Sequence, residues 1–160
     1  MDIDGVLCTT AYWAIHRFIM HKLNIGPNDS RAQLTSPDEF GDLFDPIPVK
    51  NLSAVFLATG FKIVISSTWR TAGLEVMQTM WRLRGLPGEV IAVTPHLHTA
   101  RGKEIAAWLR LNEVESYVIL DDNTDYLPEQ RPYFIRTDSQ YELTYQDAER
   151  CIKILNSFTH

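Results

Sequence analysis

The sequence predicts an α/β protein, a three-layer sandwich built on a mostly parallel sheet of five strands. Two observations support this prediction. Short apolar runs of strand length alternate along the chain with segments whose apolar residues recur at helical spacing. The strand-like runs are almost continuously apolar, which is typical of parallel strands that helices cover on both faces. The chain has 160 residues, a length that favours a single domain over residues 1–160.

The strands are expected at the start of the chain, up to Asp2, and at four later runs. These runs are FKIVIS (61–66), EVIAV (89–93), YVIL (117–120) and YFIR (133–136). β-Branched residues recur in all of them, as is usual for strands. Ligands of such sheets bind beyond the carboxyl ends of the strands, so the residues that follow each run are the candidates for a site.

Helices are expected between the strands. Apolar residues at helical spacing mark them at Tyr12 to Leu23, Leu52 to Phe56, Leu74 to Trp81, Ile105 to Leu109 and Ala148 to Leu155. Gly60 is expected to end the second of these helices. The polar stretch 24–42 is expected to hold a loop and a short helix that starts at Ser36-Pro37. Residues 10–60 would thus form a small helical cap insert.

Composition and charge exclude several classes of function. The formal net charge is −5, so no global basic field would attract nucleic acid, although a local basic patch is compatible with that charge. The longest apolar run is too short to span a bilayer, and the first residues lack the basic segment and apolar core of a secretory signal. Cys8 and Cys151 make neither a metal-like pair nor a disulfide framework. We therefore expect a cytoplasmic protein with reduced thiols and no membrane partner.

Polar side chains follow the ends of four expected strands. Asp2 and Asp4 follow the first, SSTWR (66–70) the second, TPHLHTARGK (94–103) the third and DDNTD (121–125) the fourth. Because crowded carboxylates repel one another, a divalent cation would relieve them, and an all-oxygen set of ligands suits Mg²⁺. Hydroxyls, backbone amides and a basic side chain opposite the metal would bind a phosphoryl group.

The order of these motifs resembles a known superfamily. DIDGVL, ISS, a basic residue before a helix and ILDD occur in the order of the four motifs of the haloacid dehalogenase (HAD) phosphohydrolases. ISSTWR, RGKEIAAWL, YVILDD and the closing TDSQYELTYQDAERCIKIL are similar, more narrowly, to the small HAD domain of Swiss-army-knife RNA repair proteins. The resemblance covers most of the chain and implies a Rossmann-like sandwich with phosphohydrolase chemistry.

The resemblance implies a role for each acidic residue of the motifs. Asp2 would be the nucleophile that becomes an aspartyl-phosphate, and also a Mg²⁺ ligand. Asp4 would act as general acid and then general base, and its backbone carbonyl would bind Mg²⁺. Asp122 would be a direct Mg²⁺ ligand, and Asp121 beside it would either bind the ion or support the ligands that do.

The resemblance also implies which residues would bind the phosphoryl group. Ser67 would hydrogen-bond its oxygens together with the Thr68 amide, and a shift of one position would give that role to Ser66. Either Arg101 or Lys103 would neutralise the phosphoryl charge, and the Arg-Gly pair favours Arg101, because it matches the narrower branch.

Other residues near the motifs have two interpretations each. Arg70 is either a surface residue or a substrate contact. Trp69 is expected in the core with the other tryptophans, but its place beside the motif would also let it stack on a base. His96 and His98 suggest a zinc site, but without a third ligand we expect them in a loop or against the substrate.

Three positions depart from the family pattern. Only Met1 precedes Asp2, so the central strand is expected to leave ladder groups of its neighbours unpaired, at a cost of roughly 1–3 kcal/mol for each buried group. The acid that some members place four residues after the metal ligand is replaced by Tyr126, with Asp125 one position early. Glu142 replaces the glycine of a GLT run near the end of the narrower branch.

The predicted function is a Mg²⁺-dependent phosphatase that hydrolyses a phosphomonoester through an aspartyl-phosphate. A modest insert leaves the site open to a bulky substrate. The resemblance favours a polynucleotide end with a 3′-phosphate, while a nucleotide or another phosphorylated small molecule is the alternative. A different class of function is a catalytically silent domain that binds metal or a phosphorylated partner, or serves as a scaffold, and the short first strand favours it. The sequence leaves the substrate and the oligomeric state open.

Overall fold

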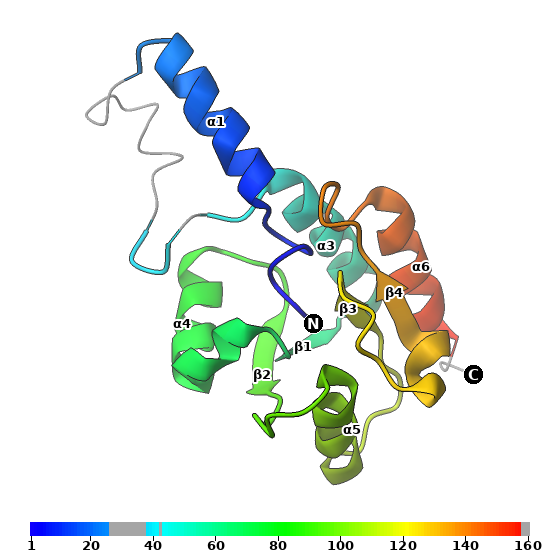
Figure 1. Cartoon of the computed structure of the whole chain (residues 1–160). Helices are drawn as coiled ribbons and strands as arrows, with labels where there is room; N and C mark the ends of the chain where they lie inside the picture. Colours follow the sequence, from blue (N-terminus) through cyan, green and yellow to red (C-terminus); the bar gives the residue numbers. More distant parts are fainter. Residues whose placement is uncertain (26–37, 42, 158–160) are drawn as a thin grey trace.

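The computed structural model describes residues 1–25, 38–41 and 43–157 (Figure 1). Its helices are α1 (Thr10–Lys22), α3 (Pro46–Thr59), α4 (Leu74–Leu83), α5 (Arg101–Leu111) and α6 (Tyr145–Asn156), with the 3-10 helices η1 (Thr68–Ala72) and η2 (Pro128–Tyr133). Its strands are β1 (Lys62–Ile65), β2 (Glu89–Val93), β3 (Ile119–Asp121) and β4 (Phe134–Arg136). These α-helices and strands fall on the segments that the sequence marks. The start of the helix expected at Ser36-Pro37 lies outside the described residues.

The described strands form two small parallel sheets, β1 with β2 and β3 with β4, and not the single five-stranded sheet that the sequence predicts. Met1 and Asp2 lie between the two sheets. Met1 N donates to Val64 O (2.7 Å), Ser66 N to Met1 O (2.9 Å) and Asp2 N to Leu120 O (2.9 Å). The expectation of a strand at the start of the chain is therefore corrected. Met1 and Asp2 make too few ladder bonds for a strand and only join the two sheets. The α/β class itself is confirmed.

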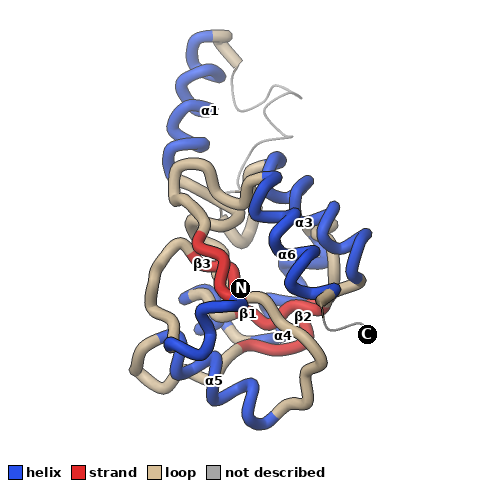
Figure 2. Tube along the Cα trace, turned by 90° about the vertical axis from the view of Figure 1, so that its right-hand side faces the viewer, coloured by secondary structure: helices blue, strands red, loops and turns tan. Residues whose placement is uncertain are grey.

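Helices cover the strands on both sides (Figure 2). α3 packs against α6, α4 packs against β2, and α5 lies on the side of the strands opposite the α3 and α6 pair. Apolar side chains between these layers form the core. The most deeply buried include Ile3, Val6, Leu7, Leu52, Val55, Ile65, Met80, Trp81, Ile135 and Leu143.

Helix α3 belongs to this core, although it falls within the insert expected at residues 10–60. The side chain of Asp45 caps its start by accepting from Ile47 N, and Pro46 occupies the first helical position. Gly60 ends the helix in the left-handed conformation, as the sequence predicts. Within the described part of the insert, α1 is therefore the helix that stands apart from the core layers.

Helix α1 projects from the rest of the molecule (Figure 1). Thr9 caps it, because its side chain accepts a hydrogen bond from Tyr12 N. Large apolar side chains of this helix remain exposed, among them Ile15, Phe18 and Ile19. No helix in the described part of the chain is long and apolar enough to cross a membrane.

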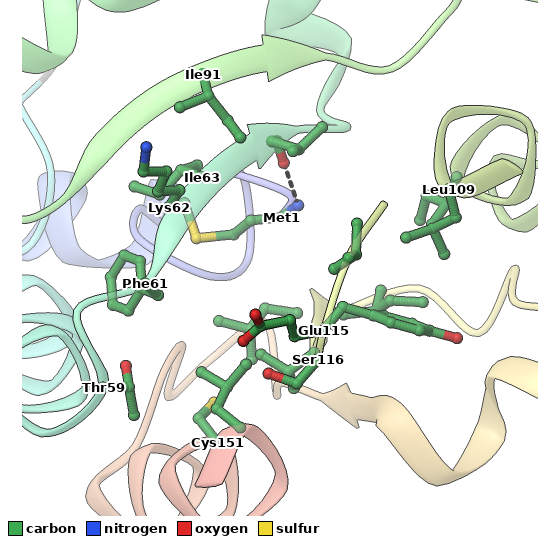
Figure 3. A pocket seen from close by; sticks show the side chains of 18 of the residues that line it. Met1, Thr59, Phe61, Lys62, Ile63, Ile91, Leu109, Glu115, Ser116 and Cys151 are labelled. Atoms are coloured by element: carbon green, nitrogen blue, oxygen red, sulfur yellow. Dashed lines mark hydrogen bonds between the residues drawn. The ribbon is translucent and has the colours of Figure 1, made fainter. Parts of the chain in front are cut away.

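A cavity of about 910 Å³ lies between β1 and β3, beside Met1 (Figure 3). Its wall includes Ile63 of β1 and Ile119 of β3, together with Cys151 from α6 and Trp108 from α5. A continuous sheet separates the two helix layers that cover it. This cavity reaches side chains of both layers, so β1 and β3 do not pair with each other along its length.

Candidate active site

The loop after Asp2 is packed against the end of β3. Asp2 is buried, and its Oδ1 accepts a hydrogen bond from Ile3 N (2.8 Å). Gly5 has a φ of 70°, and a Cβ built on it would lie 2.5 Å from Cγ of Asp122. Only glycine allows both this backbone conformation and this close approach. The DIDG motif therefore uses its glycine to bring Asp2 and Asp122 together.

Three carboxylates of the predicted site meet at the carboxyl ends of the strands. Asp2, Asp121 and Asp122 each offer an oxygen, and these atoms lie within 4.8 Å of one another. Burial raises the pKa of Asp121 to about 6, with the charge of Asp2 adding to the rise and the Arg101 guanidinium opposing it. A buried all-oxygen cluster with an excess of negative charge suits Mg²⁺, so these residues fit the ion that the sequence analysis expects.

Arg101 is the basic residue that contacts this cluster. Its NH1 lies 2.8 Å from Oδ2 of Asp2 and 3.1 Å from Oδ2 of Asp121. Lys103, the alternative to Arg101 in the sequence analysis, is exposed two residues further along α5. One guanidinium thus bridges carboxylates from the first and the fourth predicted strand ends.

Asp125 fixes the start of the helix that carries Arg101. Its Oδ2 accepts a hydrogen bond from Arg101 N (2.8 Å), and its backbone carbonyl accepts from Gly102 N (2.8 Å). Gly102 permits this approach, because a Cβ there would lie 2.8 Å from Leu127 N. The acid that the sequence analysis places one position early is therefore the cap of α5, supplied from the loop after β3.

The serines after β1 are fully buried. Ser67 caps η1, where its Oγ accepts a hydrogen bond from Trp69 N (3.4 Å). The Ser66 hydroxyl has no hydrogen-bond partner among the described residues, and Ser66 contributes to the wall of the cavity beside Met1. Thr68 is exposed at the start of η1. A hydroxyl without a partner among the described residues and the start of a short helix thus follow this strand.

Arg70 is buried, so its interpretation as a surface residue is wrong. Its NH1 donates to the carbonyl oxygens of Ser66 and Ser67, and its NH2 pairs with Glu104. Oε1 of Glu104 also accepts a hydrogen bond from Leu97 N (2.8 Å). This buried ion pair ties the turn after β1 to α5 and to the loop after β2.

Glu104 was not among the residues expected at the site. A signal was present in the sequence, since Glu104 lies four residues before Trp108, a tryptophan expected in the core. A charged residue on a buried helix face requires a partner, and Arg70 is that partner.

Residues 1–148 match the protein family described as the HAD domain in Swiss Army Knife RNA repair proteins. The chain belongs to this family. No curated protein and no solved structure gave a significant match. The likeness to HAD domains that the motifs indicate is thereby confirmed over most of the chain.

In this HAD domain, Asp4 stands apart from the carboxylate cluster. It is exposed, and the indole Nε1 of Trp69 donates to its Oδ1 (3.3 Å) and Oδ2 (3.1 Å). The Cys8 thiol lies 3.6 Å from Oδ1 of the same carboxylate. Burial and the Asp4 charge raise the pKa of the Cys8 thiol to about 12, so this thiol stays protonated. Trp69 is half-buried and packs edge-on against Phe44, with 5.8 Å between the ring centroids.

The two histidines that suggested zinc lie outside the carboxylate cluster. His96 and His98 are exposed, with 4.4 Å between their ring centroids. Within the described residues, the acidic group formed by Asp2, Asp121 and Asp122 is the arrangement of three ligands that could hold a metal ion. The histidines therefore contact each other without a third metal ligand in this part of the chain.

The segment after β4 braces the first loop of the HAD domain. Thr137 N donates to Asp121 O (3.1 Å), and the Thr137 hydroxyl donates to Gly5 O (2.8 Å). Leu143 N donates to Val6 O (3.0 Å). The residues that hold Asp2 and Asp121 in register thus come from the far end of the chain, and no local pattern in the sequence marked Thr137.

Glu142 adopts a φ of 57°, which explains why glycine suits this position in the family pattern. Its side chain is buried, and burial together with the adjacent Asp45 carboxylate raises its pKa to about 7. The Thr9 side chain hydrogen-bonds the same carboxyl group. Glu142 therefore contacts the residues that cap the starts of both α1 and α3.

Proposed function

We propose that this HAD domain is a Mg²⁺-dependent phosphatase that hydrolyses a phosphomonoester through an aspartyl-phosphate. The observation that supports it most directly is the cluster of Asp2, Asp121 and Asp122, which Arg101 bridges at the carboxyl ends of the strands. Mg²⁺ held by these carboxylates and by the Asp4 carbonyl would balance the charge of the phosphoryl group.

Two carboxylates, those of Asp2 and Asp4, carry out the steps of the proposed reaction. Asp2 attacks phosphorus, and the bond between phosphorus and the leaving oxygen breaks as Asp4 gives that oxygen a proton. Asp4 then takes a proton from water, which attacks phosphorus and releases phosphate from Asp2. The exposure of Asp4 supports its proposed exchange of protons with substrate and water, while Asp2 is buried within the site.

The remaining residues bind and orient the phosphoryl group. Arg101 lies against Asp2 and neutralises the incoming charge. The hydroxyls of Ser66 and Ser67 and the Thr68 amide supply donors from the turn after β1. Arg70 has an internal partner in Glu104, so it positions this turn from behind and does not bind the substrate.

The substrate that the family name favours is an end of RNA that carries a phosphate, and a 3′-phosphate is the specific proposal. The net charge of −5 means that recognition would depend on the phosphoryl group and its near neighbours. A nucleotide or another phosphorylated small molecule fits the same phosphoryl chemistry.

A panel of phosphomonoesters, assayed with and without Mg²⁺, tests the proposal. It includes oligonucleotides with a 3′-phosphate or a 5′-phosphate, nucleotides and sugar phosphates. We expect Mg²⁺-dependent phosphate release, with Asp2→Asn at least about a thousandfold slower because the amide cannot act as the nucleophile. Asp138→Asn, at an exposed acid outside the cluster, is the control and should keep its activity. Turnover by Asp2→Asn at the wild-type rate would refute the covalent mechanism.

A second candidate is a domain that binds metal or a phosphorylated partner without turnover. The burial of Asp2 and its ion pair with Arg101 favour it, because a nucleophile must be free to reach phosphorus. Mg²⁺ binding measured by calorimetry, together with no phosphate release from any member of the panel, would support this candidate over the phosphatase.

A further inference from the structure

The contact between Trp69 and Asp4 has a chemical property that the proposed acid and base steps require. Asp4 must carry a proton in the first step and release it before the second. An indole Nε1–H is a donor only, so it holds a carboxyl group in either protonation state without accepting the proton that this group carries. A hydroxyl or an amide in the same place would offer an acceptor and compete for that proton.

The indole is itself held in place from two directions. Trp69 lies in η1, and its backbone N donates to the Ser67 side chain. Its ring packs edge-on against Phe44, which is buried and lies beneath the guanidinium of Arg84, 4.6 Å from the ring centroid. Phe44 also neighbours Trp81, with centroids 6.4 Å apart. An exposed carboxylate otherwise samples several rotamers, and a fixed donor restricts that choice.

We propose that Trp69 is a positioning residue for the acid and base steps: its Nε1–H holds the Asp4 carboxyl group towards the leaving oxygen. The inference rests on the proposed phosphatase function. In this role Trp69 touches neither phosphorus nor metal and acts only through Asp4. Its effect therefore depends on how much the leaving oxygen needs a proton.

The leaving group separates this role from a structural one. Nitrophenolate departs without a proton, whereas the alkoxide of an alkyl phosphate needs one. We compare kcat/KM, because it reports phosphoryl transfer and excludes the later hydrolysis of the phosphoenzyme, which all substrates share. Loss of the indole N–H should thus slow the alkyl phosphate far more than 4-nitrophenyl phosphate.

The experiment compares Trp69→Phe with Trp81→Phe. Trp81 packs against the same Phe44, but its Nε1 donates to Pro87 O and not to Asp4. For Trp69→Phe we expect kcat/KM to fall by about tenfold or more with an alkyl phosphate and by less than about threefold with 4-nitrophenyl phosphate, since a positioned general acid contributes roughly 10²–10⁴-fold. For Trp81→Phe, the ratio between the two substrates should equal that of the wild type.

Each outcome decides the matter. An equal fall on both substrates for Trp69→Phe would overturn the inference and leave Trp69 a structural role. If Trp69→Phe does not fold, replacing Trp69 by benzothienylalanine keeps the bicyclic ring and removes only the N–H, and the same two substrates are compared. A wild-type protein that is inactive on every substrate would refute the proposed function, and the inference with it. An active wild type with an unchanged ratio in the variant would refute the inference alone.

Discussion

The two ends of the strands in this molecule are built differently. At the carboxyl ends, side chains from distant segments close the structure: Arg101 bridges two aspartates, and Arg70 pairs with Glu104. A cavity of about 910 Å³ extends from Ser66 towards the amino ends of β1 and β3 and reaches from one helix layer to the other. Side-chain contacts between distant segments therefore order the site.

Hydrogen bonds to the backbone show the same difference. Asp125 caps α5 from the loop after β3, and Thr137 joins the end of β4 to Gly5. On the cavity side, Met1 lies between the sheets. It forms hydrogen bonds with Val64 in β1 and with Ser66, which directly follows β1. We expect changes at the carboxyl ends to affect both stability and chemistry, and changes at the cavity to affect stability first.

The largest effect on stability is expected for Glu104→Gln. The substitution leaves the buried guanidinium of Arg70 without a charged partner, which should cost about 3–5 kcal/mol of unfolding free energy. Chemical denaturation measures it. Glu89→Gln is the matched control, because Glu89 pairs with Lys62 at the surface, where both side chains are more than 60% exposed. Comparable losses in the two variants would mean that the buried pair is no more important than the exposed one.

Asp122→Ala should weaken Mg²⁺ binding without unfolding the protein. Removal of one carboxylate from a cluster of three is expected to lower the Mg²⁺ affinity by roughly a hundredfold. Substitution of residues that only support metal ligands already lowers metal affinity by up to about that factor. Isothermal titration calorimetry measures this affinity. The control is Glu129→Ala, at an exposed acid of η2. Unchanged Mg²⁺ affinity in Asp122→Ala would remove Asp122 from the metal site.

The role of the cavity in stability can be tested by extending the chain into it. A run of about five β-branched residues, a usual strand length, joined ahead of Met1 should enter the cavity between β1 and β3. Backbone pairing with both sheets and apolar burial should stabilise the fold by about 2 kcal/mol. Thermal melts compare it with a Gly/Ser run of equal length. Equal melting temperatures would show that the cavity does not accept a strand.

Local sequence patterns were enough to predict the composition of the carboxylate cluster. Asp121 and Asp122 follow an apolar run, and Asp2 begins the DIDG motif, which marks another strand end. Because the carboxyl ends of parallel strands lie together, the meeting of these residues follows from the pattern. Arg101 was one of two alternatives, and the structure brings it and not Lys103 to the cluster. Periodicity likewise located the α-helices and strands.

The contacts that hold the cluster could not be predicted in the same way. Arg70 and Glu104 are 34 residues apart, and no periodicity links a turn after one strand to a helix after the next. The donation from Trp69 to Asp4 likewise depends on where an indole ring packs. A strand was expected before Asp2 because the first motif marks a strand end, whereas Met1 and Asp2 supply three backbone hydrogen bonds.

The smallest effect on stability is expected for a substitution of Glu142. Burial of this residue makes its charged form unfavourable in the folded protein. Its pKa is about 7 in the folded protein against 4.5 for an ordinary glutamate, because burial and the Asp45 carboxylate disfavour its charge. The folded state thus binds the proton more tightly than the unfolded state. The stability from this proton is fully present below about pH 4.5 and is lost as the pH rises through about 7.

Glu142→Gln should remove this pH dependence. The amide stays neutral, so the variant should be more stable than the wild type at pH 8 by about 1 kcal/mol, and the difference should shrink or reverse at pH 5. Urea denaturation at the two pH values measures it. Glu149→Gln, on an exposed residue of α6, is the control for the substitution itself and should show no such reversal. A wild-type protein whose stability does not fall between pH 5 and pH 8 relative to Glu142→Gln would show that the buried carboxyl group ionises freely, and that Thr9 stabilises its charge as much as Asp45 opposes it.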